Sequence, residues 1–182
     1  MPENKILIKK LLLIDANSLI HRAFHALPPF TSPMGEPTGA LYGVASILIK
    51  ILKKEPPDFI TAAFDRKEKT FRKELFEGYK AHRPQADETL IQQLIEAHNL
   101  FKAFGIQTLD AAGFEADDVI GTLVENFRHE KDLKILILSG DLDGLQLVEN
   151  EHILVWAFKK GVSETILYNE KAVEERFGLL PT

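Results

Sequence analysis

Three short, largely apolar segments constrain the fold of this chain most, because each has the length of a strand. Residues 11–14 run into Asp15, residues 59–64 run into Asp65, and residues 134–138 form the third segment. Continuous apolarity, in place of alternation, is typical of strands buried on both faces of a parallel sheet. Helical patterns separate the three segments. The chain therefore predicts an α/β fold with a mainly parallel central sheet flanked by helices.

Apolar spacing and turn residues place the other elements. Prolines between residues 28 and 37 mark a loop. The helices are expected over residues 17–27, from 38 to the Pro-Pro pair at 56, over 87–104, after residue 115 and near 170–177. A further strand is expected at 106–109, and strands at 152–158 and 163–168 form a hairpin.

Composition bounds the class of protein. The 182 residues fit one domain, 1–182, with 45% apolar and 27% charged residues, which is ordinary for a soluble globular chain. Cysteine is absent, which excludes disulfides and thiolate metal sites. No apolar run reaches membrane-span length and no signal pattern opens the chain, so a cytoplasmic protein is the default expectation. The net charge of -5 argues against a general nucleic-acid coat, although a local basic patch stays open.

Carboxylates gather at the predicted carboxyl edge of the sheet. In open α/β sheets functional groups collect at that edge, because the loops leading into helices open there. Each acid alone fits a turn or a helix cap. That explanation is poor for all of them together, since close like charges must protonate or bind cations. The seven acids are Asp15, Asp65, Glu115, Asp117, Asp118, Asp141 and Asp143.

The chemistry of these acids favours hard cations. Oxygen ligands without cysteine select Mg²⁺ or Mn²⁺ over Zn²⁺. A carboxylate-rich pocket can hold two such ions about 4 Å apart, which serves phosphodiester hydrolysis. His21 and His25 have the spacing of a metal-binding pair, but an ordinary helix surface explains them better.

A basic segment over residues 66–83 indicates the substrate. It holds seven bases and three acids, a local balance of +4 in a chain of net charge -5, with aromatic residues interleaved. Bases that engage phosphates and rings that stack on bases fit a single-stranded nucleic acid. The alternative is a salt-bridged helix with Phe71, Leu75 and Phe76 toward the core. The basic segment directly follows Asp65, which favours contact with a nucleic acid over the salt-bridged helix.

Six motifs resemble one family in the same order along the chain. With these residues, the chain resembles the 5′-nuclease domain at the amino end of bacterial DNA polymerase I, within the flap-endonuclease group. The motifs are Leu12–Ser18, Ala63–Asp65, Thr70–Arg72, Tyr79–Pro84, Gly113–Asp118 and Ser139–Asp143.

The resemblance implies a PIN-like domain with a helical arch at about residues 66–87. Such a domain cleaves 5′ flaps or 5′ ends of DNA in replication and repair, using two ions of Mg²⁺ or Mn²⁺. By the same resemblance, Asp15 and Asp65 are ligands of the first ion and Asp141 and Asp143 of the second. Glu115, Asp117 and Asp118 lie between the two ions.

The arch residues take their roles from the same resemblance. Lys80 and Arg83 match the basic pair that contacts the phosphate near the scissile bond. Arg72 and Tyr79 are expected to contact the nucleic acid. Tyr42 is expected to pack in the core and not to support the substrate.

Two departures from the family pattern stand out. Leu142 replaces the usual basic residue of the Asp-x-Asp element, and Gly144 replaces a larger apolar residue. The family also continues past a Gly-Leu-x-Pro stretch, here residues 178–181, into a helix-hairpin-helix region that this chain lacks. We therefore expect a fragment that turns over weakly or undetectably alone. The implied parent is a monomer without membrane contact, with a polymerase domain on the same chain.

Two alternatives remain open from the sequence. A PIN-type ribonuclease would share the metal chemistry, and composition does not separate RNA from DNA. A non-catalytic Mg²⁺-binding signalling module, similar to a receiver domain, would also gather acids at a sheet edge. That fold wants an acid pair after the first strand, whereas Ala16 follows Asp15.

Overall fold

The structure is a computed structural model that describes residues 8–82 and 86–181. Within these residues six strands form one sheet in the order β3-β2-β1-β4-β5-β6, and only β6 runs antiparallel to its neighbour. The predicted α/β fold with a mainly parallel sheet is confirmed. The strands are β1 (Lys9–Asp15), β2 (Phe59–Ala63), β3 (Gln107–Leu109), β4 (Leu133–Ser139), β5 (Ile153–Lys160) and β6 (Glu164–Tyr168).

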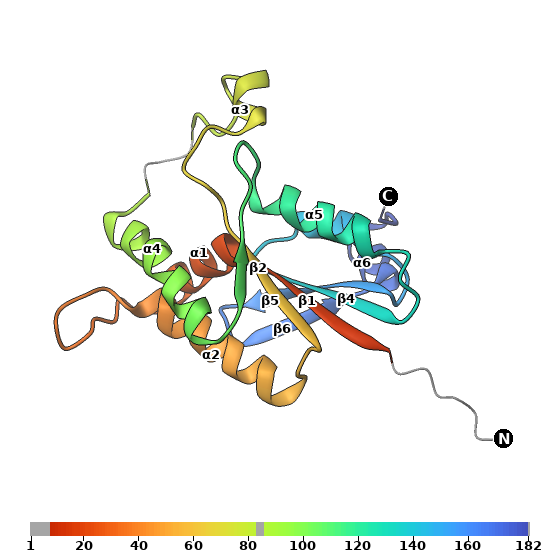
Figure 1. Cartoon of the computed structure of the whole chain (residues 1–182), viewed down its shortest axis with the longest axis horizontal. Helices are drawn as coiled ribbons and strands as arrows, with labels where there is room; N and C mark the ends of the chain where they lie inside the picture. The colour runs from red at the N-terminus through yellow and green to blue at the C-terminus, as the bar shows by residue number, and fades with distance from the viewer. Residues whose placement is uncertain (1–7, 83–85, 182) are drawn as a thin grey trace.

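Helices cover both faces of the sheet, as in a doubly wound fold (Figure 1). On one face lie α1 (Ala16–Ala26), α2 (Gly39–Lys54) and α4 (Glu88–Ala103), and on the other α5 (Ala116–Phe127) and α6 (Glu170–Phe177). The short elements are α3 (Phe71–Leu75) and the 3-10 helix η1 (Asp143–Leu147). Over the part of the chain that the structure describes, no helix is both long and apolar enough to cross a membrane.

The strand order decides one alternative. Receiver-type folds use the order 2-1-3-4-5, whereas here the chain adds β2 and β3 on one side of β1 and then crosses to β4 on the other. The direction of winding therefore reverses between β1 and β4. The signalling-module alternative does not fit this topology, and the switch point places the crevice between the ends of β1 and β4.

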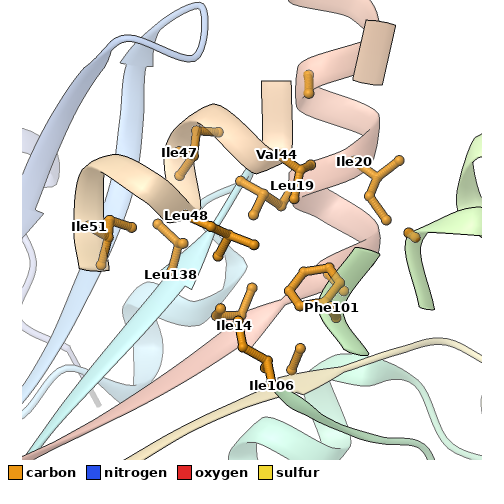
Figure 2. Close-up of a cluster of buried hydrophobic side chains, with 14 of the residues drawn as sticks. Ile14, Leu19, Ile20, Val44, Ile47, Leu48, Ile51, Phe101, Ile106 and Leu138 are labelled. Carbon is orange, nitrogen blue, oxygen red and sulfur yellow. The ribbon is translucent and has the colours of Figure 1, made fainter. Parts of the chain in front are cut away.

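Alternating side chains of β1 feed two separate cores. Leu12 and Ile14 belong to the cluster under α1, α2 and α4, while Leu11 and Leu13 belong to the cluster under α5. Figure 2 shows the first cluster, in which Ile14 lies near Phe101 of α4. Burying one Leu or Ile side chain contributes about 1.5–3 kcal/mol. Packing on both faces fixes β1, and so fixes the place where Asp15 leaves the sheet.

The basic segment is not the salt-bridged helix of the alternative interpretation. Its only helix among the described residues is the five-residue α3, and turns follow it to residue 82. Leu75 and Phe76 are 81% and 67% exposed, so the interpretation that places them in the core is wrong. Figure 1 shows the segment extending away from the carboxyl edge of the sheet.

Tyr42 also departs from expectation. Its side chain is exposed, and its ring meets that of Phe30 edge to face, with 5.6 Å between the centroids. The predicted core packing of Tyr42 is therefore wrong. The reason is local: the loop before α2 folds back over the helix and supplies Phe30 as a surface partner.

Candidate active site

Six of the seven predicted acids line one hollow of about 920 Å³ at the carboxyl edge of the sheet. Side chains of α1, among them Arg22, form another wall, and Tyr79 and Lys80 of the basic segment close a third side. Asp118 is the exception, because it lines a neighbouring depression beside Phe71 and Phe114. The six acids in the hollow are Asp15, Asp65, Glu115, Asp117, Asp141 and Asp143.

Asp15 is the most buried of these acids and begins α1. Its side chain is 4% exposed, and Oδ1 accepts the Ser18 N–H at 3.1 Å as the N-cap of the helix. The Ser139 hydroxyl donates to Oδ2 at 3.1 Å. Burial raises the pKa of Asp15, and the charge of Asp141 adds to the rise, while the hydrogen bonds from Ser18 and Ser139 oppose it.

Asp65 connects three elements at the rim of the hollow. Its backbone N–H donates to Asn17 Oδ1 at 3.1 Å, and its Oδ1 accepts the Ala116 N–H at 2.7 Å. Ala116 is the first residue of α5, so the carboxylate also serves a free amide at a helix start. Asn17 therefore fixes the backbone of Asp65, a role that sequence reasoning did not assign to it.

Asp117 is the acid of the hollow whose pKa is raised most clearly by its neighbours. Its pKa is raised to about 7, first by burial and then by the charges of Asp15, Asp141, Asp143 and Asp65. By accessible surface Asp117 is nevertheless an exposed residue, so solvent screens the neighbouring charges and limits their effect. Four carboxylates that follow three different strands, β1, β2 and β4, thus act on one residue of α5. The sequence predicts this convergence.

Asp141 and Asp143 follow β4 in a tight turn. Asp141 Oδ1 accepts the Asp143 N–H at 3.1 Å and the Ser139 hydroxyl at 3.2 Å. Asp143 begins η1, and both acids are exposed toward the hollow. Asp141 is therefore held by hydrogen bonds from the Ser139 hydroxyl and from the backbone N–H of Asp143.

Glu115 and Asp118 are neutralised by the protein itself. Arg72 donates to both oxygens of Asp118, at 2.6 and 2.7 Å, and this pairing holds the pKa of Asp118 below its ordinary value. Lys80 Nζ lies 2.9 Å from Glu115 Oε1, and the Tyr79 hydroxyl donates to Oε2 at 3.1 Å. Asp118 also accepts the Glu115 N–H at 2.9 Å, which caps α5.

The base of the basic segment is anchored next to these pairs. The Phe71 N–H donates to the Gly113 carbonyl at 2.9 Å, and the rings of Phe71 and Phe114 lie 5.5 Å apart. Lys80 adopts a left-handed backbone with φ of 55°, which is uncommon for a residue other than glycine. Arg83 lies outside the described residues, so its predicted role stays a prediction.

The oxygen ligands of the hollow are of the type that hard cations prefer, but their side chains are not arranged around one ion. Among the described residues, no three histidine or acidic side chains converge closely enough to hold one ion as they stand. The six acids of the hollow nevertheless offer oxygen ligands, and the raised pKa of Asp117 shows that their negative charges are not balanced. His21 and His25 also line the hollow, with ring centroids 6.4 Å apart. The predicted division of the acids between two ions stays a prediction.

A mainly parallel sheet, an acid-lined hollow at its switch point and a basic segment beside it define a nuclease-type α/β domain. The family model described as 5′-3′ exonuclease, N-terminal resolvase-like domain matches residues 10–178. The chain belongs to this family.

Relatives agree with that assignment. DNA polymerase I of Mycobacterium leprae is 42% identical over 173 residues, which cover 94% of this chain and 19% of the relative. A 5′-3′ exonuclease of Aquifex aeolicus is 37% identical over 174 residues, covering 96% of this chain and 58% of the relative. The chain thus spans about a fifth of the length of the polymerase relatives.

A solved structure shows the same fold at low identity. The bacteriophage T5 D15 protein, co-crystallised with metal ions, superposes with a TM-score of 0.73 at 20% identity. The match covers 94% of this chain and 62% of the T5 protein. This likeness supports the fold with its antiparallel edge strand and adds no residue assignment.

Proposed function

We propose that this chain is the metal-dependent nuclease domain of a 5′-3′ exonuclease, and that it hydrolyses phosphodiester bonds at DNA 5′ ends or flaps. The observation that carries the proposal is the convergence of four aspartates on Asp117, beside Lys80 at the rim of the same hollow. Unbalanced negative charge calls for cations, and a lysine beside it suits a phosphate. Membership in the 5′-3′ exonuclease family supports the proposed reaction.

The hollow would hold Mg²⁺ or Mn²⁺, in two ions by the family resemblance. Asp15 and Asp65 would hold one, Asp141 and Asp143 the other, with Asp117 between them. When bound, such ions supply Lewis-acid stabilisation for displacement at phosphorus and activate the attacking water. The T5 protein crystallised with metal ions, and a T5 flap endonuclease captured with DNA and metal ions, support this chemistry.

The chain's own residues bind and orient the substrate. Lys80 can exchange Glu115 for a phosphate oxygen, since both are anionic oxygens within reach of one ammonium. Tyr79 lies beside it and offers a ring for base stacking. Arg72 is engaged by Asp118, so its first role is to hold the basic segment against α5. By the family resemblance, we propose that Arg83 contacts the phosphate together with Lys80.

The parent protein extends the proposal. The polymerase relatives are about five times longer than this chain, and we propose a cytoplasmic, monomeric parent with a polymerase domain. Preference for flaps over other 5′ ends belongs to the same proposal. The 182-residue chain alone is expected to turn over weakly or undetectably.

The test is cleavage of a 5′-labelled flap DNA by the parent chain with Mn²⁺ or Mg²⁺. Asp117→Asn is expected to lower the rate at least about 100-fold, because metal assistance is worth several kcal/mol and each ~1.4 kcal/mol is tenfold. Asp110→Asn is the matched control, since Asp110 pairs with the exposed Arg66 outside the hollow. A wild-type rate for Asp117→Asn would contradict the proposal. Preference for a matched RNA flap would redirect it to a ribonuclease.

A further inference from the structure

Ser139, the last residue of β4, links two acids that come from different strands. Its hydroxyl lies 3.1 Å from Asp15 Oδ2 and 3.2 Å from Asp141 Oδ1. Ser139 is 3% exposed, so water does not compete freely for these contacts. The residue stands one position past the last β1–β4 pair, Ile14–Leu138, and therefore at the switch point of the sheet.

A second serine holds this hydroxyl in place. Ser18 Oγ lies 3.0 Å from Ser139 Oγ, and it accepts the Gly140 N–H at 2.8 Å. Ser18 Oγ also lies 3.3 Å from the Asp15 carbonyl, to which it can donate. The start of α1 and the turn after β4 are thereby joined through two hydroxyls.

The hydrogen bond between the two serine hydroxyls runs from Ser18 to Ser139. Ionised Asp15 and Asp141 can only accept, so the single hydroxyl proton of Ser139 is directed to their oxygens and Ser18 is the donor to Ser139 Oγ. The Asp141 N–H points to Ser139 Oγ at 3.3 Å, so that oxygen is also an acceptor. One small group thus contacts a carboxylate from each side of the switch point.

The backbones of Ser18 and Gly140 pack closely against each other. A Cβ on Gly140 would lie 2.3 Å from the Ser18 carbonyl oxygen and 2.7 Å from its carbonyl carbon, which are closer than real contacts. Only glycine permits this approach of the two segments. Main-chain packing therefore fixes the backbone of Ser18 against that of Gly140, the neighbour of Ser139.

We propose that Ser139 is a positioning residue whose hydroxyl sets the spacing of the Asp15 and Asp141 carboxylates, with Ser18 holding that hydroxyl in orientation. The inference rests on the proposed function, because the spacing matters when the two acids share divalent ions. Groups that orient metal ligands typically change affinity or activity 10–100-fold when they are removed. Neither serine needs to touch the ion or the substrate.

The test compares Mn²⁺ binding by Ser139→Ala and wild type. Free Mn²⁺ is titrated by electron paramagnetic resonance, well below the unfolding midpoint, and unfolding of the metal-free protein is measured separately. Ser139→Ala is expected to bind Mn²⁺ about tenfold more weakly. Ser46→Ala is the matched control, since the Ser46 hydroxyl only donates to the Tyr42 carbonyl within α2. Ser46→Ala is expected to leave Mn²⁺ affinity unchanged.

Two further variants keep the test decisive. If Ser139→Ala does not fold, Ser139→Cys retains the volume with a weak donor, and the same loss of affinity is expected. Ser18→Ala is expected to cause a smaller loss, and the Ser18→Ala/Ser139→Ala double variant no more than Ser139→Ala alone, because the serines act in series. A purely structural serine would lower the unfolding midpoint with unchanged Mn²⁺ affinity, which would overturn the inference. Failure of wild type to bind Mn²⁺ would instead overturn the proposed function.

Discussion

The acids at the carboxyl edge fall into two groups with opposite fates. The paired group, Glu115 and Asp118, is neutralised by Lys80 and Arg72. The open group has no salt bridge to any basic side chain in residues 8–82 and 86–181. The open group consists of Asp15, Asp65, Asp117, Asp141 and Asp143.

Two adjacent residues of α5 belong to different groups. Asp117 and Asp118 are neighbours on α5, yet burial and neighbouring acids raise the pKa of the first while Arg72 lowers that of the second. Successive residues on a helix are rotated by about 100°, so they face different surroundings. The comparison indicates which charges the fold satisfies itself and which it leaves for an external cation.

Within the paired group the largest expected effect comes from Lys80, which joins this group to the proposed substrate. Lys80→Ala should lower flap cleavage by the parent chain about 100-fold, the typical loss of one donor to transition-state charge. Metal affinity should change less than about fivefold, because a pair with a one-third exposed lysine contributes at most about 1 kcal/mol. Cleavage rate and Mn²⁺ affinity are measured on one preparation. Equal changes in both would show that Lys80 belongs with metal binding.

The second prediction removes the cation of the other pair. Arg72→Ala leaves Asp118 without its bidentate partner and should lower the free energy of unfolding by about 1–2 kcal/mol, since both side chains are only partly buried. Arg66→Ala is the control, because its pairs with Glu68 and Asp110 are exposed to solvent and should contribute little to stability. Urea unfolding measures both. Equal losses would show that Arg72 does not anchor the basic segment.

The sequence predicts the open group better than the paired group, for a physical reason. The apolar strands end at Asp15 and Asp65, and a parallel sheet brings such ends to one edge, so topology alone places these acids. The pairing of Arg72 with Asp118 depends on how the chain folds back after α3, which no periodicity encodes. The alternative of a salt-bridged helix with Leu75 and Phe76 in the core fails for the same reason.

Small polar residues account for most of what the sequence did not reveal. Asn17 holds the backbone of Asp65, and the Ser18 N–H donates to Asp15. Ser139 contacts both Asp15, which is 124 residues away in the chain, and Asp141. A local signal exists only for Ser18, which lies three residues after Asp15 and fits a helix-cap pattern. The exposed Tyr42 had no such signal, because its partner Phe30 comes from a loop of unpredicted path.

The smallest expected effect tests the open group through pH. The folded-state pKa of Asp117 is about 7, against an ordinary value of 3.8, so the folded protein binds the proton more tightly than the unfolded chain. Its contribution to stability is therefore complete below pH 3.8 and is lost as the pH rises through about 7. Asp118 acts in the opposite sense, because its lowered pKa contributes stability that is lost on acidification.

Asp117→Asn should consequently stabilise the metal-free protein at about pH 8 and give no gain at about pH 5, where the wild-type carboxyl is already protonated. Solvent access to Asp117 screens its charge and keeps the gain below the loss expected for Arg72→Ala. Thermal unfolding at the two pH values, with chelator present, measures the difference. Asp118→Asn is the matched control and should destabilise at pH 8, since it weakens the contact with Arg72. Destabilisation by both variants at pH 8 would mean that the two groups do not differ, because Asp117 would then have a partner that neutralises it as Arg72 neutralises Asp118.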